Sequence, residues 1–183
     1  MGELALSTHW QRLVLTSIRE FIQWEAALID LYNGQDADAV QAASYETLRT
    51  AMAAALFLHH FTEVAFARGA LTHIHANNKR ALFNAVGGWP IAVNGTNRPD
   101  DMKILGEVAD AVKHGVLNAN HIIHVPKNGR VIEISHAQPL FGEGHQDDKP
   151  QVIISTAAGA RSFRAVVENV CRGWTNQLNL DPI

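Results

Sequence analysis

Apolar residues in the first part of the chain recur at the spacing of an α-helix. Over 7–32 they follow one another at intervals of three and four residues, which places them on one helical face. Ser7 or Thr8 can cap this helix, and Asn33-Gly34 can end it. The pattern predicts a long amphipathic helix with one face packed against a partner. The positions on that face are Trp10, Val14, Ile18, Phe21, Trp24, Leu28 and Leu31.

The segment 45–75 is apolar on nearly every side when it is drawn as a helix. Such a helix usually lies at the centre of a fold, so its polar side chains should contact other elements. His59 and His60 are neighbours on it and diverge by about 100°. We therefore expect one of the two to be buried and hydrogen-bonded, since a buried ring without a partner loses roughly 1–3 kcal/mol. The candidate partners on the same side are Arg49 and Glu63.

Shorter elements follow, and the pattern changes from helical to β-rich towards the C-terminal third. Helices are predicted over 79–86 and from Asp100 onward, and a last helix over 160–178 carries an apolar stripe. Between the last two helices lie runs rich in β-branched residues. Strands are predicted there at 121–125, 130–135 and 151–155, with a hairpin turn at 126–129.

These elements predict a mainly α (α+β) fold: a helical bundle with a small antiparallel β-sheet inserted before the last helix. The chain has 183 residues, of which 47% are hydrophobic and 18% are charged, a balance typical of globular proteins. This length suits one domain with a sizeable core. Since neither a repeat nor a linker composition interrupts the sequence, we expect a single domain over 1–183.

Charge and cysteine content narrow the possible partners. The net charge is −3 and no block of Lys or Arg stands out, so nucleic acid is not an expected partner. Cys171 is the lone cysteine, which excludes an intrachain disulfide and a cysteine-based zinc site. No charged-then-apolar leader is present, and polar residues interrupt every apolar run well short of about 18 residues. We expect a cytoplasmic protein that does not enter a membrane.

Histidines and carboxylates at helical spacing make a metal site the first chemical hypothesis. His59, His60 and Glu63 lie within one turn of each other, and Glu107, Asp110 and His114 fall on one face of a later helix. Facing helices that supply imidazoles and carboxylates can bind a divalent transition metal. The alternative is that the first group is a polar helix–helix contact and the second a solvated face. Neither segment contains the Glu-x-x-His of di-iron bundles or the His-Glu-x-x-His of zinc proteases.

Two short resemblances add further candidates. Arg68 and His73 are similar to the Arg-x4–6-His pair of HEPN ribonucleases, which implies helical bundles that cleave RNA across a dimer. With ten Arg and ten His in the chain, a match of this kind arises once or twice by chance. The segment 109–117, Ala-Asp-Ala-Val-Lys-His-Gly-Val-Leu, resembles a pattern in uncharacterised bacterial helical proteins. The positions that match its Ala-Asp-x-x-Lys-His core are Asp110, Lys113 and His114.

The patterns leave the functional class open between three hypotheses. The first is a non-catalytic binding or interaction protein, expected to form a homodimer because it has long apolar helices and four tryptophans. The second is a metal-dependent or acid–base enzyme centred on the histidines and carboxylates named above. The third is a HEPN-like ribonuclease with Arg68 and His73 as catalytic candidates. Lys113, from the Ala-Asp-x-x-Lys-His segment, is a further catalytic candidate outside that hypothesis. Serine hydrolase and P-loop motifs are absent from the sequence.

Overall fold

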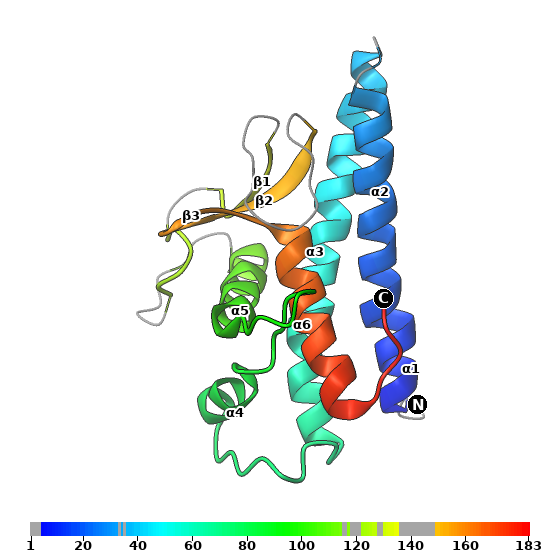
Figure 1. Ribbon diagram of the computed structural model, residues 1–183. Helices are drawn as coiled ribbons and strands as arrows, with labels where there is room; N and C mark the ends of the chain where they lie inside the picture. Colours follow the sequence, from blue (N-terminus) through cyan, green and yellow to red (C-terminus); the bar gives the residue numbers. More distant parts are fainter. Residues whose placement is uncertain are drawn as a thin grey trace.

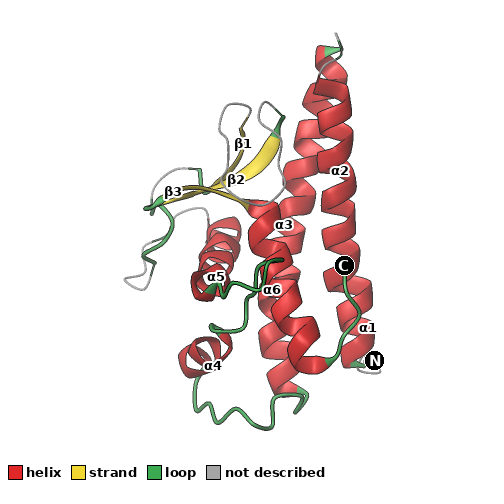
Figure 2. Ribbon diagram, viewed as in Figure 1, coloured by secondary structure: helices red, strands yellow, loops and turns green. Residues whose placement is uncertain are grey.

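The computed structural model of the chain describes residues 5–32, 34, 36–114, 117, 122–127, 130–135 and 149–183. These residues form five helical stretches and a three-stranded antiparallel sheet directly before the last helix (Figure 1). The predicted fold class is therefore confirmed. The sheet and two of the helices lie on one side of the long helices, and α6 lies between them in this view (Figures 1 and 2).

Two long antiparallel helices form the backbone of the fold. The first comprises α1 (Leu6–His9), η1 (Trp10–Leu15) and α2 (Thr16–Tyr32), which run without interruption, η1 being a turn of π-helix. The second is α3 (Ala37–Ala67), which packs along the first for most of its length (Figure 1). Asp36 caps α3 by accepting a hydrogen bond from the backbone N–H of Ala39 at 3.0 Å.

The end of α3 differs from the expectation that this element ran to residue 75. Gly69 adopts φ +69°, a left-handed conformation that glycine reaches without steric strain. The N–H of Ala70 then donates to the carbonyl of Ala65 at 3.0 Å, the hydrogen bond of a Schellman cap. The helix therefore stops at Ala67, and the following histidines lie outside it.

Three shorter helices pack against this pair: α4 (Lys79–Val86), α5 (Pro99–His114) and α6 (Phe163–Leu178). Aromatic side chains connect them at the centre of the molecule. Phe61 of α3 lies 4.8 Å from the Trp10 ring and 5.0 Å from the Trp174 ring, measured between centroids. Trp174 also meets Trp89 edge to face at 5.1 Å. Edge contacts of this kind add to the burial of apolar surface, so α6 is held in the core through its last turns.

The sheet has three antiparallel strands in the order β1 (Ile132–Ser135), β2 (Gln151–Thr156) and β3 (Gly159–Ser162). The sequence predicted a strand at 121–125 and a helix from 160. Both expectations are wrong for the residues that the structure describes. The chain makes a tight hairpin after β2 and forms β3, so α6 begins only at Phe163, where Ser162 caps it.

The segment 122–125 is not a strand because its backbone bonds to a side chain. Glu107 is 6% exposed, and its carboxylate accepts hydrogen bonds from the N–H groups of Ile123, His124 and Val125 at 3.1, 2.8 and 2.8 Å. A ladder to another strand would need these same donors. Glu107 is thus a structural anchor. The face predicted to be solvated is buried at Glu107, half-buried at Asp110 and exposed at His114. Residue 121 lies outside the described residues.

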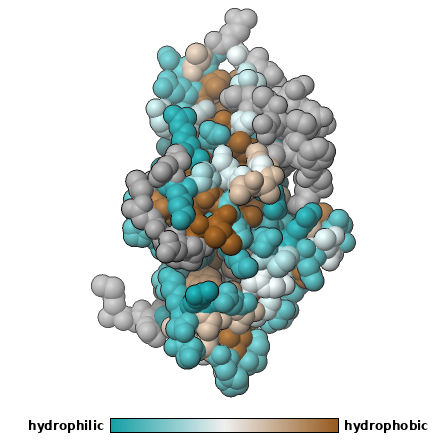
Figure 3. Space-filling view, turned by 90° about the vertical axis from the view of Figure 1, so that its left-hand side faces the viewer, coloured by the Kyte–Doolittle hydropathy of each residue, from teal (hydrophilic) through white to brown (hydrophobic). Residues whose placement is uncertain are grey.

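The molecular surface is mixed. The face shown in Figure 3 is largely hydrophilic, with its most extensive hydrophobic patch near the middle and smaller ones above and below it. By length and composition α3 could cross a membrane, but half of its most apolar window is buried in the molecule. Core helices of soluble proteins pass the same test, so this observation does not assign α3 to a membrane.

A close backbone contact at α6 yields a stability prediction. A Cβ added at Gly173 would lie 2.6 Å from the carbonyl oxygen of Trp89, and backbone cannot move aside cheaply. We expect Gly173→Ala to destabilise the protein by about 1–3 kcal/mol through overpacking, measured by urea unfolding. Gly88→Ala is the matched control, because nothing lies within 4 Å of its added Cβ. Equal effects of the two substitutions would contradict the contact.

Candidate functional site: a pocket between two helices and the C-terminal segment

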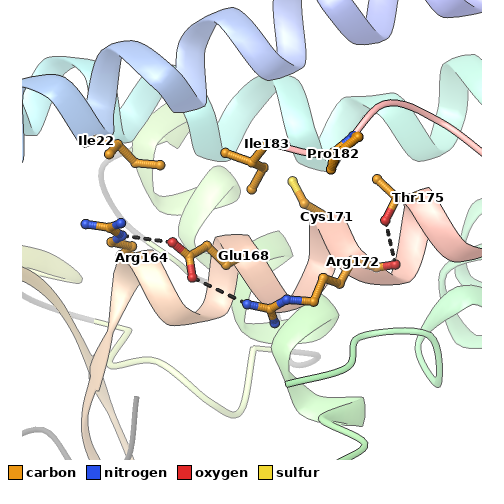
Figure 4. A pocket seen from close by; sticks show the side chains of 8 residues that line it. All are labelled: Ile22, Arg164, Glu168, Cys171, Arg172, Thr175, Pro182 and Ile183. Carbon is orange, nitrogen blue, oxygen red and sulfur yellow. Dashed lines mark hydrogen bonds and ion pairs between the residues drawn. The ribbon is translucent and has the colours of Figure 1, made fainter. Parts of the chain in front are cut away.

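A pocket of about 350 Å³ lies between α2, α6 and the C-terminal segment (Figure 4). This volume is within the range of small-molecule sites. One wall is apolar and comes from α2 and the C-terminal segment, and the facing wall is polar and comes from α6. The lining residues are Ile22, Arg164, Glu168, Cys171, Arg172, Thr175, Pro182 and Ile183.

The polar wall follows from the spacing of charged residues on α6. Arg164, Glu168 and Arg172 are four residues apart, so they lie above one another on one helical face. Arg164 Nε donates to Glu168 Oε1 at 2.8 Å, and Arg172 Nη2 lies 3.4 Å from Glu168 Oε2 (Figure 4). One carboxylate is thus shared between two guanidinium groups. The side chains of the lining thus carry two positive charges and one negative charge.

A buried polar network holds one end of this wall. Arg172 Nη1 donates at 2.8 Å both to the carbonyl of Ile91 and to Asn169 Oδ1. Asn169, which is fully buried, donates through Nδ2 to Asp101 Oδ2 at 2.8 Å, and Arg161 Nη2 donates to the other oxygen of Asp101. Burial raises the pKa of Asp101, and these hydrogen bonds partly offset that effect. Ile91 and Asn169 therefore hold the Arg172 side chain in place, and Asp101 of α5 in turn holds Asn169.

Glu25 of α2 lies behind the other end. Its side chain is 1% exposed, and Oε1 accepts the backbone N–H of Val152 at 3.1 Å. Oε2 is buried without a hydrogen-bond partner and lies 3.8 Å from Arg164 Nη1. Burial raises the pKa of Glu25 to about 7, against the opposing effects of the Val152 hydrogen bond and Arg164. Glu25 therefore changes charge near neutral pH, directly behind a residue that lines the pocket.

The C-terminal segment forms the apolar wall and is attached to the first helix. Trp10 Nε1 donates to the carbonyl of Asp181 at 2.9 Å, and Gln11 Nε2 donates to Asp181 Oδ2 at 2.6 Å. Arg19 Nη2 reaches the carbonyl of Pro182 at 3.4 Å. These contacts place Pro182 and Ile183 opposite α6 (Figure 4).

Cys171 closes the floor of the pocket as an apolar group. Burial raises the pKa of its thiol far above the ordinary value, so the thiol stays protonated at neutral pH. A protonated thiol is a poor nucleophile, because the thiolate is the reactive form. Cys171 therefore supplies surface to the pocket and no covalent chemistry.

Sequence reasoning did not select this site, although it left two signals. Arg164, Glu168 and Arg172 alternate in sign at four-residue intervals on a predicted helix. Glu25 falls between Phe21 and Leu28 on the apolar face of the first helix, where a carboxylate is out of place. Neither signal shows that α2 and α6 meet, since that depends on packing between distant segments.

His59 is the buried member of the adjacent histidine pair, as expected, and His60 is exposed. The ring of His59 stacks on Phe83 with 4.5 Å between centroids, and its edge lies against Gly106, where an added Cβ would be 3.0 Å from Cε1. Burial lowers the pKa of His59 to about 4, against the opposing effect of Asp110. The ring is therefore neutral in the fold.

Among the described residues, neither Arg49 nor Glu63 forms the hydrogen bond that was expected with His59. Its Nδ1 is buried without a partner, and both proposed partners are engaged elsewhere. Arg49 pairs with Glu46 at 2.7 Å, and Glu63 pairs with Lys79 at 2.7 Å. That part of the prediction is wrong, because each charged residue finds a nearer group of opposite charge.

The proposed metal ligands are only partly brought together. Glu63 is held by Lys79, His60 faces the ring of His9 at 6.5 Å, and His114 is exposed at the end of α5. Asp110 is half-buried and close enough to affect His59. Among the residues that the structure describes, no three His, Cys, Asp or Glu side chains converge as metal ligands would. The metal site thus stays a hypothesis without a formed ligand cluster.

The ribonuclease candidates lie at the end of α3 and beyond it. Arg68 is the C-terminal cap of α3 and is exposed. His73 is also exposed, and its ring stacks on Trp89 at 6.2 Å. Lys113 is exposed in the last turn of α5, far along the chain from either.

Comparison with known proteins leaves the chain without detectable relatives. No family model matches it, and neither a curated protein nor a solved structure is detectably similar. The resemblances noted from short motifs therefore gain no support, and the function has to be argued from the site itself.

The placement of His59 and His60 gives an expected difference in stability. We expect His59→Ala to destabilise the fold by roughly 1–3 kcal/mol, because it empties a packed site, and His60→Ala to have little effect. Since the pKa of His59 is lower in the fold than in the unfolded chain, wild type loses stability as pH falls from about 6.5 to about 4. The loss caused by His59→Ala should therefore be smaller at pH 5 than at pH 7. Unfolding in urea at both pH values measures this, and equal effects of the two alanines would contradict it.

Proposed function

We propose that the protein is a non-catalytic binding protein and that the pocket between α2 and α6 holds a small organic ligand. The observation that carries this proposal is the pairing of an apolar wall with a preorganised row of ionic groups. Ile22 and the C-terminal segment supply the first, and Arg164, Glu168 and Arg172 supply the second. Ligand sites combine apolar surface, which buries the body of the ligand, with a few fixed polar groups that orient it.

The same arrangement favours binding over catalysis. Glu168 is the acidic group on the lining, and its two oxygens are occupied by Arg164 and Arg172. Cys171 stays protonated. A general base or a nucleophile needs a free reactive atom facing the substrate, and this lining offers ionic contacts instead. Neither the metal-enzyme nor the ribonuclease hypothesis gains a comparable observation from the described residues.

Three probes with one six-carbon body test the pocket: hexanoate, hexanol and hexylamine. We expect at least one probe to bind saturably. Binding is measured from changes in the amide chemical shifts in NMR spectra, and these changes should be confined to the residues that line the pocket. Thr175→Leu should weaken that binding at least tenfold, because the larger side chain fills part of the pocket. Asn176→Leu, on an exposed position of the same helix, is the control and should bind as wild type. If no probe binds, or if both variants bind equally well, the proposal fails.

The homodimer and cytoplasmic location expected from the sequence remain separate proposals. Apolar side chains exposed on the long helices support the dimer: Trp24, Leu31, Tyr32, Tyr45 and Met52. We expect sedimentation equilibrium to return about twice the chain mass of 20.1 kDa. Replacing Trp24 and Tyr45 together with Ser should shift the protein towards monomer without lowering its helical content. A wild-type protein that stays monomeric at high concentration would contradict the dimer.

A further inference from the structure

We infer that the pocket binds a small carboxylate with an apolar body, and that Glu25 takes up a proton when this anion binds. The inference rests on the proposed function and adds to it the class of ligand and its control by pH. Three features carry it: the charge of the lining side chains, the donors of Arg164 that no described residue uses, and the position of Glu25 behind Arg164.

The side chains that line the pocket have an excess of positive charge. Arg164 and Arg172 contribute two charges and Glu168 removes one. A monovalent anion would neutralise the one positive charge that remains, whereas a cation would increase the net positive charge. The pocket lies between α2, α6 and the C-terminal segment, so charges in it are screened less than on an open surface. An anionic head group is therefore favoured over a neutral or cationic one.

Arg164 has the donors that such a head group needs. A guanidinium carries five N–H groups, and Arg164 uses Nε for Glu168. Its terminal nitrogens make no hydrogen bond with any residue that the structure describes, and the nearest acidic atom to them is Glu25 Oε2 at 3.8 Å. Arg172 donates through Nη1 to Ile91 and Asn169, so it has fewer N–H groups left for a ligand than Arg164 has. A planar carboxylate matches the fork of Arg164.

The opposite wall explains the apolar body. Ile22, Pro182 and Ile183 face the guanidinium groups across the pocket (Figure 4). An aliphatic or aromatic chain attached to the carboxylate would bury its surface there, at about 25 cal/mol per Å². Inorganic phosphate has a negative charge but no aliphatic or aromatic body, so it would leave the apolar wall of the pocket exposed to water.

Glu25 sets whether Arg164 is available. Among the described residues, the charged groups that act on Glu25 are Arg164 and Glu168, both from α6, while β2 contributes the Val152 N–H. α3, which also packs on α2, contributes no charged group to this set. With Glu25 ionised, the four charges sum to zero and Glu25 competes with a ligand for Arg164. With Glu25 neutral, one positive charge remains for the ligand.

The linkage fixes the direction of the pH effect. Since the pKa of Glu25 is about 7, most of the protein has a neutral Glu25 at pH 6 and an ionised one at pH 8. A ligand that requires the neutral form has its dissociation constant divided by the fraction in that form. We expect hexanoate, which is ionised at both pH values, to bind about tenfold more tightly at pH 6 than at pH 8. Hexanol should show no such change.

The test is calorimetric titration of wild type and variants with hexanoate at pH 6 and pH 8. Glu25→Gln keeps an oxygen for the Val152 N–H but cannot ionise, so its binding should be equal at both pH values and as tight as that of wild type at pH 6. Glu20→Gln, an exposed position on the same helix, should keep the tenfold change. Arg164→Gln should weaken hexanoate at least tenfold at pH 6 and leave hexanol unchanged. Melting curves confirm that each variant is folded.

The outcomes separate this inference from the function on which it rests. Binding of hexanol or hexylamine in the pocket without tighter hexanoate binding would overturn the ligand class and leave the binding function standing. Hexanoate affinity that is the same at pH 6 and pH 8, or that changes equally in Glu25→Gln, would overturn the role of Glu25. Phosphate that binds as tightly as hexanoate would overturn the need for an apolar body. Failure of every probe to bind would overturn the proposed function itself.

Discussion

A carboxylate buried on a helix has to take its hydrogen bonds from another element, and three such carboxylates connect the helices of this protein to the rest of the chain. Glu25 accepts from the backbone of β2, Asp101 accepts from Arg161 and Asn169, and Glu107 accepts from the backbone of 123–125. Leaving a buried acceptor unsatisfied costs about 1–3 kcal/mol, and more for a charged one. These contacts therefore determine where the sheet, α6 and the segment after α5 lie.

Of the three, Glu25 is the least satisfied, and that makes it the one suited to control a site. Asp101 accepts a hydrogen bond from Arg161 on one oxygen and from Asn169 on the other. Glu107 accepts hydrogen bonds from three backbone N–H groups. Glu25 has a hydrogen bond on one oxygen and a longer contact of 3.8 Å to Arg164 on the other. An incompletely satisfied carboxylate gains little from ionising, so its charge can follow the occupancy of the neighbouring pocket.

The differences between the expected and observed elements have a common cause. The strand expected at 121–125 had suitable residues, but Glu107 supplied acceptors for its N–H groups from a helix. The last helix was expected from 160, but 159–162 pair with β2 instead. His59 was expected to bond to Glu63 or Arg49, and each of those found an ion-pair partner of its own. In every case a contact from a distant or competing group decided between two states that local preference left close in energy.

Periodicity was sufficient to predict the helices and their apolar faces, because a helix forms its backbone hydrogen bonds within itself and its pattern is local. Residues 79–86 were predicted and found as α4 with the same bounds, and the last helix ends at Leu178 as expected. Strand pairing and the pocket were decided only by tertiary structure. Their hydrogen bonds and walls join residues far apart in the chain, such as Glu25 with Val152 and Ile22 with Arg164, and no local pattern records which helices meet. The chemistry of the candidate site was thus present in the sequence as isolated charges, and packing of α2 against α6 gave those charges a shared cavity.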